Sequence, residues 1–542
     1  MDAVTSTPVP VNEPIRAYAP GSAERASLEA KLKELAAEPL ELTMTVGGAQ
    51  RMAGGDRVDV VQPHRHAAVL GTTAQATAAD VQSAVDAAKE AARPWRDLPF
   101  DERAAVLLRM ADLLAGPWRD TINAATMLGQ SKTVYQAEID AACELIDFLR
   151  YNVHFARQIL TEQPASAPGM WNRMEYRPLE GFTLAITPFN FTSIAANLPL
   201  APALMGNTVV WKPSPTQGFA AHLTMRLMEA AGLPPGVVNL VTGDGAAVSA
   251  VALGDADLAG IHFTGSTRTF QHLWRTVGEN IAGYRGYPRL VGETGGKDFV
   301  VAHPSADPHA LVTALVRGAF EYQGQKCSAA SRAYLPRSLW EGGVRDQLAD
   351  TTSALSYGDV TDLSHFGGAV IDRRAYARLA GVLDRARGDT ELDVLAGGSA
   401  SDEVGYFIEP TVLVGTNPAH EVFTDEYFGP VLSVFVYEDG DWDGVLDLVD
   451  TSTPYALTGA VFATDRTVID AASTRLRFAA GNFYVNDKPT GAVVGQQPFG
   501  GARASGTNDK AGSVWNLTRW VSPRTIKETF AAPTDHRYPH MG

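Results

Sequence analysis

The stretch that decides the fold is "GVVNLVTGDGAAVSAVALGDADLAGIHFTGSTRTFQHLWRTVGENIA", residues 236–282. It predicts a strand at 236–245, a helix at 245–254, a strand at 259–266 and a helix at 267–282. Upstream, "FTLAITPFN" (182–190) and "NTVVWKPSP" (207–215) are strand-like, and "GFAAHLTMRLMEAAG" (218–232) is helical. Strands that alternate with helices predict a mainly parallel sheet with helices on both faces.

The pattern extends in both directions from this stretch. A second alternating region runs from about 298 to 485. Toward the N-terminus, the pattern predicts a helix within residues 22–38, capped by Ser22. It predicts another within residues 76–99, ended by Pro94, and two more within residues 101–133. The Pro-rich arm before them is expected to lie along a surface. A chain of 542 residues is long enough for more than one domain.

Composition excludes several classes of protein. The formal net charge of −16 argues against a nucleic-acid binder. The chain has two cysteines, so a four-cysteine zinc site is impossible; one disulfide is possible, but a reduced intracellular protein is favoured. With no secretory signal and no apolar run long enough to span a bilayer, we expect a cytoplasmic protein without a membrane partner.

One of the two cysteines is Cys327, in "GQKCSAASR" (324–332). A thiol attacks only as the thiolate, so a catalytic cysteine needs neighbours that favour negative charge, and Lys326 is adjacent. From this loop alone, an inert buried cysteine is an equal alternative.

Two further polar residues follow strand-like runs. Glu293, in "LVGETGGKDF" (290–299), can be a partly desolvated general base with a raised pKa, or an ordinary glutamate at a surface turn. Asn190, in "ITPFNFTS" (186–193), can donate to an oxyanion, or satisfy the backbone of its own loop.

A possible anion site lies in "HFTGSTRTF" (262–270), where a strand is followed by Gly265 and Ser266 and then by a helix. Backbone N–H groups and the positive end of the helix would face an anion there. The stretch lacks the GxGxxG pattern, so a purely structural turn is an equal alternative.

Taken in order, these motifs resemble the aldehyde dehydrogenase superfamily. The order is Asn190, Lys212, "FTGS" (263–266), "ETGGK" (293–297), "GQKC" (324–327) and "DEYFGP" (425–430), and it covers essentially the whole chain. The resemblance implies an α/β fold with a Rossmann-like NAD-binding domain, an α/β catalytic domain and a β-flap for oligomerisation. The domain boundaries that it implies are 1–164 (arm and first part of the NAD-binding domain), 165–181 (oligomerisation hairpin), 182–293 (NAD-binding core), 294–510 (catalytic domain) and 511–542 (C-terminal oligomerisation arm).

Within the superfamily, the chain is similar to the Δ1-pyrroline-5-carboxylate dehydrogenases. The similar stretches are "NEPIRAYAPGSAER" (12–25), "TPFNFTSI" (187–194), "FTGSTRTFQHLW" (263–274), "FEYQGQKCSAASR" (320–332) and "VGQQPFGGARASGTNDKAG" (494–512). The resemblance implies NAD-dependent oxidation of L-glutamate γ-semialdehyde to L-glutamate, the second step of proline catabolism. The chain has no room for a fused proline dehydrogenase, so any functional link would be to a separate one.

The resemblance also implies the catalytic roles. Cys327 would add to the aldehyde, Asn190 and the Cys327 N–H would hold the oxyanion, and Glu293 would activate the water that hydrolyses the thioester. No metal is implied.

For NAD, the resemblance implies contacts from Thr187, Pro188, Phe189, Lys212, Ser214, Gly243, Gly265, Ser266, Thr267, Arg268, Thr269, Glu426 and Phe428. One position departs from the family. Many NAD-specific members have a glutamate three residues after the lysine, and this chain has Pro215. A carboxylate there would repel the 2′-phosphate of NADP, so its absence weakens the exclusion of NADP, although NAD is favoured.

For the substrate, the resemblance implies contacts from Phe189, Lys326, Ser328, Gly491, Ala492 and Phe499. The stretch "NDKPTGAVVGQQPFGG", residues 486–501, is called the anchor loop below. The Gly491 and Ala492 amides and the Ser328 hydroxyl would bind the α-carboxylate, and Lys326 would add positive charge. Some relatives have serine at the position of Ala492. In this chain the backbone N–H of that residue can still donate, but the side-chain contact of the serine is lost. The phenylalanines would pack the aliphatic part of the substrate, or belong only to the core.

Assembly follows from the same resemblance. Residues 166–181 predict a hairpin, and 515–530 predict a terminal strand that extends a neighbour's sheet, so at least a homodimer is expected. Two alternatives stay open: an aldehyde dehydrogenase for another acid semialdehyde, such as succinate semialdehyde, and a catalytically silent relative.

Overall fold

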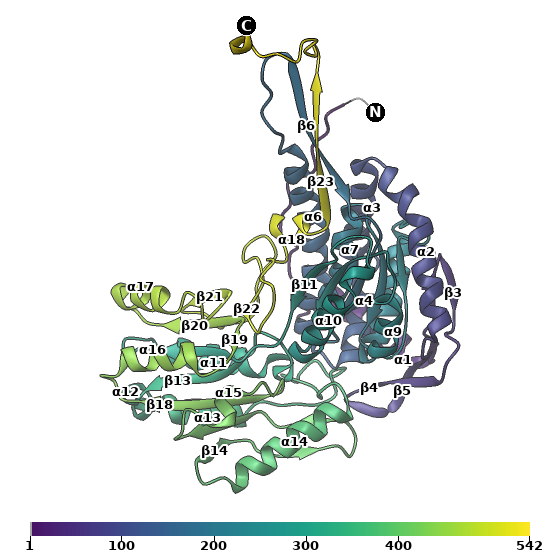
Figure 1. Ribbon diagram of the computed structural model, residues 1–542. Coiled ribbons are helices and arrows are strands. Elements are labelled where there is room, and N and C mark those ends of the chain that lie inside the picture. The colour runs from purple at the N-terminus through teal and green to yellow at the C-terminus, as the bar shows by residue number, and fades with distance from the viewer. Residues whose placement is uncertain (1–2) are drawn as a thin grey trace.

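The computed structural model describes residues 3–542. Figure 1 shows two α/β lobes, the first coloured purple to teal and the second green, with a two-stranded flap that projects from the first lobe and carries the C-terminus. Each lobe is built on a seven-stranded sheet. The change from one sheet to the other falls between Glu293 and Asp298, next to the predicted boundary at 293/294.

The first sheet is mainly parallel, as predicted. Neighbouring strands of its parallel part, from β11 to β9, all pair in parallel, whereas β2 and β3 join antiparallel at the far edge. The strands β2 and β3 were not predicted, because each is only three residues long and the pair joins the sheet through β9, which is distant in the chain. In spatial order the strands are β11 (Arg289–Glu293), β10 (Leu258–Thr264), β7 (Phe182–Thr187), β8 (Thr208–Pro213), β9 (Val238–Leu240), β2 (Met44–Val46) and β3 (Ala49–Arg51).

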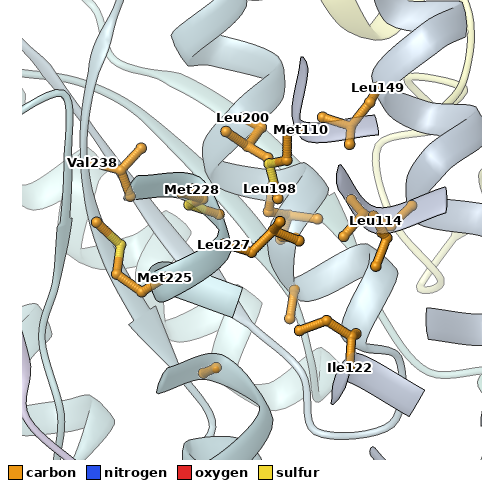
Figure 2. Packing of buried hydrophobic residues seen from close by; sticks show 14 of the residues in the cluster. Met110, Leu114, Ile122, Leu149, Leu198, Leu200, Met225, Leu227, Met228 and Val238 are labelled. Atoms are coloured by element: carbon orange, nitrogen blue, oxygen red, sulfur yellow. The ribbon is translucent and has the colours of Figure 1, made fainter. Parts of the chain in front are cut away.

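Helices cover both faces of this sheet because successive side chains of its strands point to opposite faces. In β7, Phe182 and Leu184 pack against one group of helices, and Ala185 packs against the other. The first group is α2 (Ala78–Asp97), α9 (Gly245–Ala252) and α10 (Thr267–Glu279). The second, part of whose packing is shown in Figure 2, is α1 (Ala23–Ala37), α3 (Phe100–Ala115), α4 (Arg119–Gln130), α6 (Glu144–Thr161), α7 (Thr192–Leu204) and α8 (Gly218–Ala230).

Two N-terminal helices test the predictions of helix ends. Ser22 caps α1 by accepting a hydrogen bond from the Arg25 N–H, as predicted. The prediction that Pro94 ends α2 is wrong, because α2 continues to Asp97. Pro94 lies in the last turn, and the helix continues through Trp95, which is buried and donates from Nε1 to the Ala203 carbonyl at 2.8 Å.

The helix α7 was not predicted because it contains Pro199 and Pro202. A proline lacks the N–H that would bond the carbonyl four residues earlier. Pro202 has no N–H to donate to the Leu198 carbonyl. That carbonyl instead accepts a hydrogen bond from His262 Nδ1 at 2.9 Å. Burial lowers the pKa of His262 to about 4, so its neutral ring supplies the missing donor.

The second sheet is also mainly parallel, with one antiparallel edge strand, β14. In spatial order its strands are β14 (Leu392–Ala396), β17 (Thr411–Gly415), β18 (Val431–Tyr437), β13 (Ala330–Pro336), β12 (Asp298–Ala302), β20 (Thr458–Phe462) and β21 (Asn482–Val485). Its helices are α11 (Pro308–Phe320), α12 (Arg337–Leu339), α13 (Arg345–Ser353), α14 (Arg373–Gly388), α15 (Glu421–Thr424), α16 (Trp442–Thr451) and α17 (Arg466–Arg475).

The flap corrects one prediction. Residues 166–181 do not form a hairpin with themselves: they contribute the single strand β6 (Met170–Pro178). Its antiparallel partner is β23 (Val521–Thr529), the predicted terminal strand. Pairing runs from Val521 opposite Pro178 to Thr529 opposite Met170.

The remaining elements lie outside the two seven-stranded sheets. They are β1 (Leu40–Glu41), β4 (Arg57–Gln62), β5 (Arg65–Ala74), β15 (Ala400–Ser401), β16 (Phe407–Ile408), β19 (Tyr455–Ala456), β22 (Ala502–Arg503), α5 (Val134–Ala137), α18 (Val514–Thr518), the π-helical η1 (Glu138–Cys143) and η5 (Trp340–Val344), and the 3₁₀ turns η2 (Pro215–Gln217), η3 (Ile281–Gly283), η4 (Glu321–Gly324) and η6 (Pro539–Met541). Among residues 3–542, no helix combines the length and apolar character that crossing a bilayer requires.

Candidate active site

The candidate site lies at the carboxyl edge of the first sheet, where it meets the second lobe. Strand register aligns the ends of the parallel strands: Thr187 pairs with Pro213, and Thr264 with Glu293. The Gly265 N–H donates to the Glu293 carbonyl at 3.1 Å, which ties the predicted anion-binding turn to the predicted base. In open α/β sheets this edge is where ligands bind.

A cavity of about 780 Å³ brings most of the predicted substrate and catalytic residues together. Its walls include Cys327, Glu293, Lys326, Ser328, Gly491, Ala492 and Phe499. Asn190 and Phe189 are not among its lining residues. A thiol, a carboxyl group and several polar groups therefore share one enclosed space of a size suited to a small molecule.

Cys327 lies on the short link between η4 and β13. The turn before it is tight: Tyr322, Gln323 and Gly324 all have positive φ, and a side chain at Gly324 would meet the backbone of Gly429. Cys327 is partly exposed to the cavity, whereas Cys143 is buried, and both are free. Both cysteines are among the cavity's lining residues, and the greater exposure of Cys327 favours it as the more accessible thiol.

The protonation of Cys327 differs from the expectation. Burial raises the pKa of Cys327 well above its usual value, and the nearby carboxyl groups, chiefly Asp298 and Glu293, raise it further. Lys326 does not counter this, because its ammonium is directed at Asp140 (3.4 Å) and Glu321 (3.9 Å). At neutral pH the sulfur is therefore a thiol.

Asn190 is buried close to the segment that carries Cys327. Its Nδ2 donates to the Gln325 carbonyl at 3.0 Å, two residues before Cys327. An amide nitrogen has two protons, so this bond fixes the orientation of the side chain and leaves a second proton for another acceptor.

Glu293 ends β11, lines the cavity and contacts the last residue of the anchor loop. Burial raises the pKa of its carboxyl group well above the usual value, as predicted, although the Gly501 N–H and the charge of Lys510 oppose the shift. Its Oε2 accepts from the Gly501 N–H at 3.1 Å. A carboxyl group with a raised pKa is suited to taking and releasing a proton near neutral pH.

The anchor loop contributes one polar wall. Ser328 Oγ lies 2.7 Å from Thr490 Oγ1, directly before Gly491 and Ala492. Gly491 has φ +90°, a conformation that glycine adopts without strain. Phe189 instead packs edge-on against Phe428, with ring centroids 5.8 Å apart.

Most predicted cofactor residues lie outside the cavity, at the ends of β7, β8 and β10. The Lys212 ammonium is buried near the first residue of α9, and burial lowers its pKa to about 8 although Asp244 opposes the shift. Ser214 donates its N–H to the Thr187 carbonyl at 3.0 Å. Gly243 has φ +113°, and a Cβ there would lie 2.8 Å from the Ala76 nitrogen.

The predicted anion-binding turn opens α10. Ser266 is the N-cap and accepts from the Thr269 N–H. Thr267 Oγ1 donates to the Ala504 carbonyl at 3.2 Å, and Arg268 is exposed. The first turn of α10 thus presents free backbone N–H groups, as an anion site requires.

Glu426 approaches from the second lobe. Its Oε1 accepts from the Gly296 N–H at 3.0 Å. Burial raises the pKa of Glu426 to about 7, and in the same place burial lowers the pKa of Lys297 to about 7. A side chain at Gly295 would collide with the Glu426 carboxylate, so this close approach requires glycine.

Sequence analysis missed the acidic wall of the cavity. Glu144 lies at the start of α6, is enclosed, and accepts from Ser193 Oγ at 2.5 Å. Burial and the neighbouring Asp140 raise its pKa to about 8. The available signal was a set of carboxylates in the helical segment 138–147, but only the irregular π turn η1 determines which of them face the cavity.

One cluster of possible metal ligands occurs among residues 3–542: Asp389, Glu391 and His420, which are not among the residues that line the cavity. His420 Nδ1 accepts the Val422 N–H, so the neutral ring carries its proton on Nε2, which lies 3.1 Å from Asp389 Oδ2. This arrangement is a helix cap rather than a ligand set.

With the site described, similarity to known proteins becomes informative. The family model described as "Aldehyde dehydrogenase family" matches residues 51–526. The chain belongs to the aldehyde dehydrogenase family. The resemblance inferred from motif order is thereby confirmed at family level.

Named relatives refine this assignment. The enzyme is 50% identical over 536 residues to the "Probable delta-1-pyrroline-5-carboxylate dehydrogenase" of Schizosaccharomyces pombe, covering 97% of each chain. It is 46% identical to the human mitochondrial delta-1-pyrroline-5-carboxylate dehydrogenase, covering 99% of this chain and 95% of the human one. A crystal structure of the Mycobacterium tuberculosis Delta-pyrroline-5-carboxylate dehydrogenase bound with NAD matches with a TM-score of 0.97, 64% identity and full coverage of both chains.

Proposed function

We propose that the enzyme oxidises L-glutamate γ-semialdehyde to L-glutamate with NAD as the oxidant. The observation that carries the proposal is the cavity that holds Cys327 and Glu293 together with polar walls at the anchor loop and at Glu144. Full-length similarity to dehydrogenases named for Δ1-pyrroline-5-carboxylate supports the choice of substrate.

In this proposal, Cys327 Sγ bonds to the aldehyde carbon and the thiol proton passes to water in the cavity. The second proton of Asn190 Nδ2 and the Cys327 N–H hold the oxyanion that forms. Because Asn190 is already oriented by the Gln325 carbonyl, little reorganisation is needed. When bound, NAD accepts a hydride from the same carbon, which leaves a thioester on Cys327.

Glu293 then acts on water. Its enclosed carboxyl group takes a proton from a water molecule, the resulting hydroxyl attacks the thioester carbon, and the Cys327 sulfur leaves. The Gly501 N–H holds one carboxyl oxygen and leaves the other for the water. The raised pKa of Glu293 makes it a stronger base than an exposed glutamate.

The residues predicted to hold NAD fit that molecule. The free N–H groups at the start of α10 suit the pyrophosphate, and the enclosed Lys212 ammonium suits the adenosine ribose. Glu426 suits the hydroxyls of the nicotinamide ribose, since a carboxylate is a strong acceptor. The remaining predicted contacts, from Thr187, Pro188, Phe189 and Phe428, stay predictions.

The substrate proposal depends on different hydrogen-bonding groups at the two walls: N–H and O–H donors at the anchor loop, and the carboxyl group of Glu144, whose pKa of about 8 lets it lose its proton to meet a cation. The Gly491 and Ala492 amides with Ser328 would bind the α-carboxylate, and Glu144 would meet the α-ammonium. A charge-assisted hydrogen bond to such a group is worth about 1.5–3 kcal/mol. Succinate semialdehyde lacks the ammonium, so Glu144 supplies a reason for discrimination between the two acid semialdehydes.

The deciding experiment compares kcat/KM for glutamate semialdehyde and succinate semialdehyde at saturating NAD. We expect preference for glutamate semialdehyde, and preference for succinate semialdehyde would refute the substrate proposal. Cys327→Ala should abolish NADH formation while NAD still binds, and turnover retained in that variant would refute the role of the nucleophile.

Glu144→Gln provides the matched test of the acidic wall. It should lower kcat/KM for glutamate semialdehyde about 10- to 100-fold and leave succinate semialdehyde nearly unchanged, because only the first substrate has an ammonium group. An equal loss for both substrates would show that Glu144 acts only on the structure of the cavity.

We also propose a homodimer or larger assembly through the flap, a cytoplasmic location, and a separate proline dehydrogenase as supplier of the substrate. A β-ribbon of two strands is marginally stable alone, which supports a partner at its open edges. Cell fractionation would test the location, since the human relative is named as mitochondrial.

A further inference from the structure

The N-terminal arm takes part in the cavity, although the proposed chemistry gives it no role. Asn12, Glu13 and Ile15 are among the lining residues, on the same cavity as Cys327. The arm is held on the first lobe by Glu13, which bonds Arg119 Nη1 at 2.5 Å and Arg150 Nη1 at 2.8 Å. Its backbone is fixed as well, because the Glu13 N–H donates to Asp147 Oδ1 at 2.7 Å.

Asn12 connects this arm to the anchor loop. Its Nδ2 donates to the Val494 carbonyl at 2.8 Å and to Asp147 Oδ2 on α6 at 2.8 Å. Its Oδ1 accepts from Gln496 Nε2 at 2.9 Å and from the Tyr151 hydroxyl at 3.3 Å. Both ends of one amide therefore join α6 to the anchor loop.

The anchor loop needs such support. It runs without regular structure from the end of β21 toward β22. Its own bonds close a turn at Val493, whose N–H donates to Gln497 Oε1 at 2.9 Å. At Gly495 the loop touches Tyr151 so closely that a Cβ would lie 2.2 Å from the ring. Asn12 bonds the loop on both sides of this contact.

We propose that Asn12 is a positioning residue that holds the anchor loop against α6, so that the Gly491 and Ala492 amides are preorganised for the α-carboxylate of the substrate. This inference rests on the proposed function. Fixing a loop before binding removes the entropy of ordering it from the cost of binding. Asn12 acts through the loop, so its loss should weaken binding of substrates with an α-carboxylate and spare the chemistry at Cys327.

The test is steady-state kinetics of Asn12→Ala on two aldehydes, glutamate semialdehyde and propanal, which has no carboxylate. We expect KM for glutamate semialdehyde to rise about tenfold, with kcat for that substrate and kcat/KM for propanal both within about twofold of the wild-type values. Gln496→Ala removes one of the two bonds by which Asn12 holds the loop and should raise the same KM by a smaller factor. The double variant should be no worse than Asn12→Ala alone.

Thr5→Ala is the matched control. Thr5 holds the same arm to the body of the protein, through Asp101 at 2.5 Å and Arg157 at 3.1 Å, but does not line the cavity. It should leave the kinetic constants for both aldehydes at the wild-type values. If Thr5→Ala matches Asn12→Ala, the arm acts as a whole and the assignment to Asn12 is wrong.

The outcomes separate this inference from the proposed function. Wild-type enzyme that fails to prefer glutamate semialdehyde over succinate semialdehyde overturns the proposed function before any variant is made. If that preference holds, two results overturn the positioning role. In the first, Asn12→Ala keeps the wild-type KM for glutamate semialdehyde. In the second, it lowers kcat/KM for both aldehydes equally. A variant of Asn12 that does not fold leaves the decision to Gln496→Ala, judged by the same criteria.

Discussion

At the scale of single residues, the burial of Cys327 and the carboxyl groups near it favour the protonated thiol. Because its pKa is raised well above the usual value, the thiolate fraction lies far below one half at neutral pH and rises with pH. Alkylation of the cofactor-free enzyme by iodoacetamide should therefore accelerate about tenfold per pH unit between pH 6 and 9. The rate of inactivation checks this, with Cys327→Ala to correct for Cys143. A plateau near pH 7 would show that the thiolate is already formed.

Pro215 gives a second prediction at this scale. It stands where many NAD-specific relatives have the glutamate that repels the 2′-phosphate of NADP. Pro215→Glu should lower kcat/KM with NADP about 100-fold relative to NAD, because like charges brought together cost several kcal/mol. Competing the two cofactors in one assay measures the ratio. An unchanged ratio would mean that the ribose lies elsewhere.

Particular residues show how much of the site could be predicted from the sequence. Cys327, Glu293 and the anchor-loop glycine Gly491 follow motifs of fixed order, and the structure places them on one cavity. The charge state of Cys327 was not predictable, because it depends on burial and on the charges of Asp298 and Glu293, which come near the thiol only in the folded chain. Lys326 is adjacent in sequence but bonds away from the sulfur.

At the scale of elements, the flap is the feature that calls for a partner. Trp171 is 51% exposed on β6, and the neighbouring strand β23 offers an open edge and Ile526, which lies opposite Arg173. The double variant Trp171→Ala, Ile526→Asp should shift the enzyme from an oligomer to a monomer, since both changes remove apolar surface from the ribbon. Light scattering after size exclusion measures the mass.

Val404→Asp is the control for this variant, because Val404 is 61% exposed on the loop before β16, away from the flap. It should keep the wild-type mass. If the flap variant also keeps that mass, the subunits associate through another surface.

Element predictions failed where distant residues decide the structure. The Pro94 prediction failed because burial of Trp95 carries α2 one turn further than a proline would allow in isolation. The helix α7 tolerates Pro202 because His262 bonds the freed Leu198 carbonyl. The hairpin prediction failed because β6 finds its partner about 350 residues later, in β23.

At the scale of the whole molecule, the two lobes meet at the predicted NAD site. Lys212 and the start of α10 belong to the first lobe, and Glu426 belongs to the second. NAD at 100 times its Kd should stabilise the folded enzyme by about 2.7 kcal/mol, and hydrogen exchange should slow in both lobes. Slower exchange confined to the first lobe would contradict contact with Glu426, and Glu426→Ala should show that restricted pattern.

The alternation of strands and helices predicted both parallel sheets because each strand is buried on two faces and is strongly apolar. The same periodicity did not predict how the lobes are arranged. It depends on pairings such as β2 with β9, and on the flap, where the two partners are separated by most of the chain.

The bond between Asn12 and Gln496 spans 484 residues of sequence, and this sets the order of events during synthesis. A ribosome that adds 5–20 residues per second needs about 25–100 seconds between making the first partner and the second. For all that time the leading segment has no loop to fasten to. The semialdehyde chamber is thus among the last parts of the nascent polypeptide to close. In a product that stops short of residue 496 the leading segment keeps its contacts with Arg119 and Arg150, but the chamber stays open on the side of the missing loop.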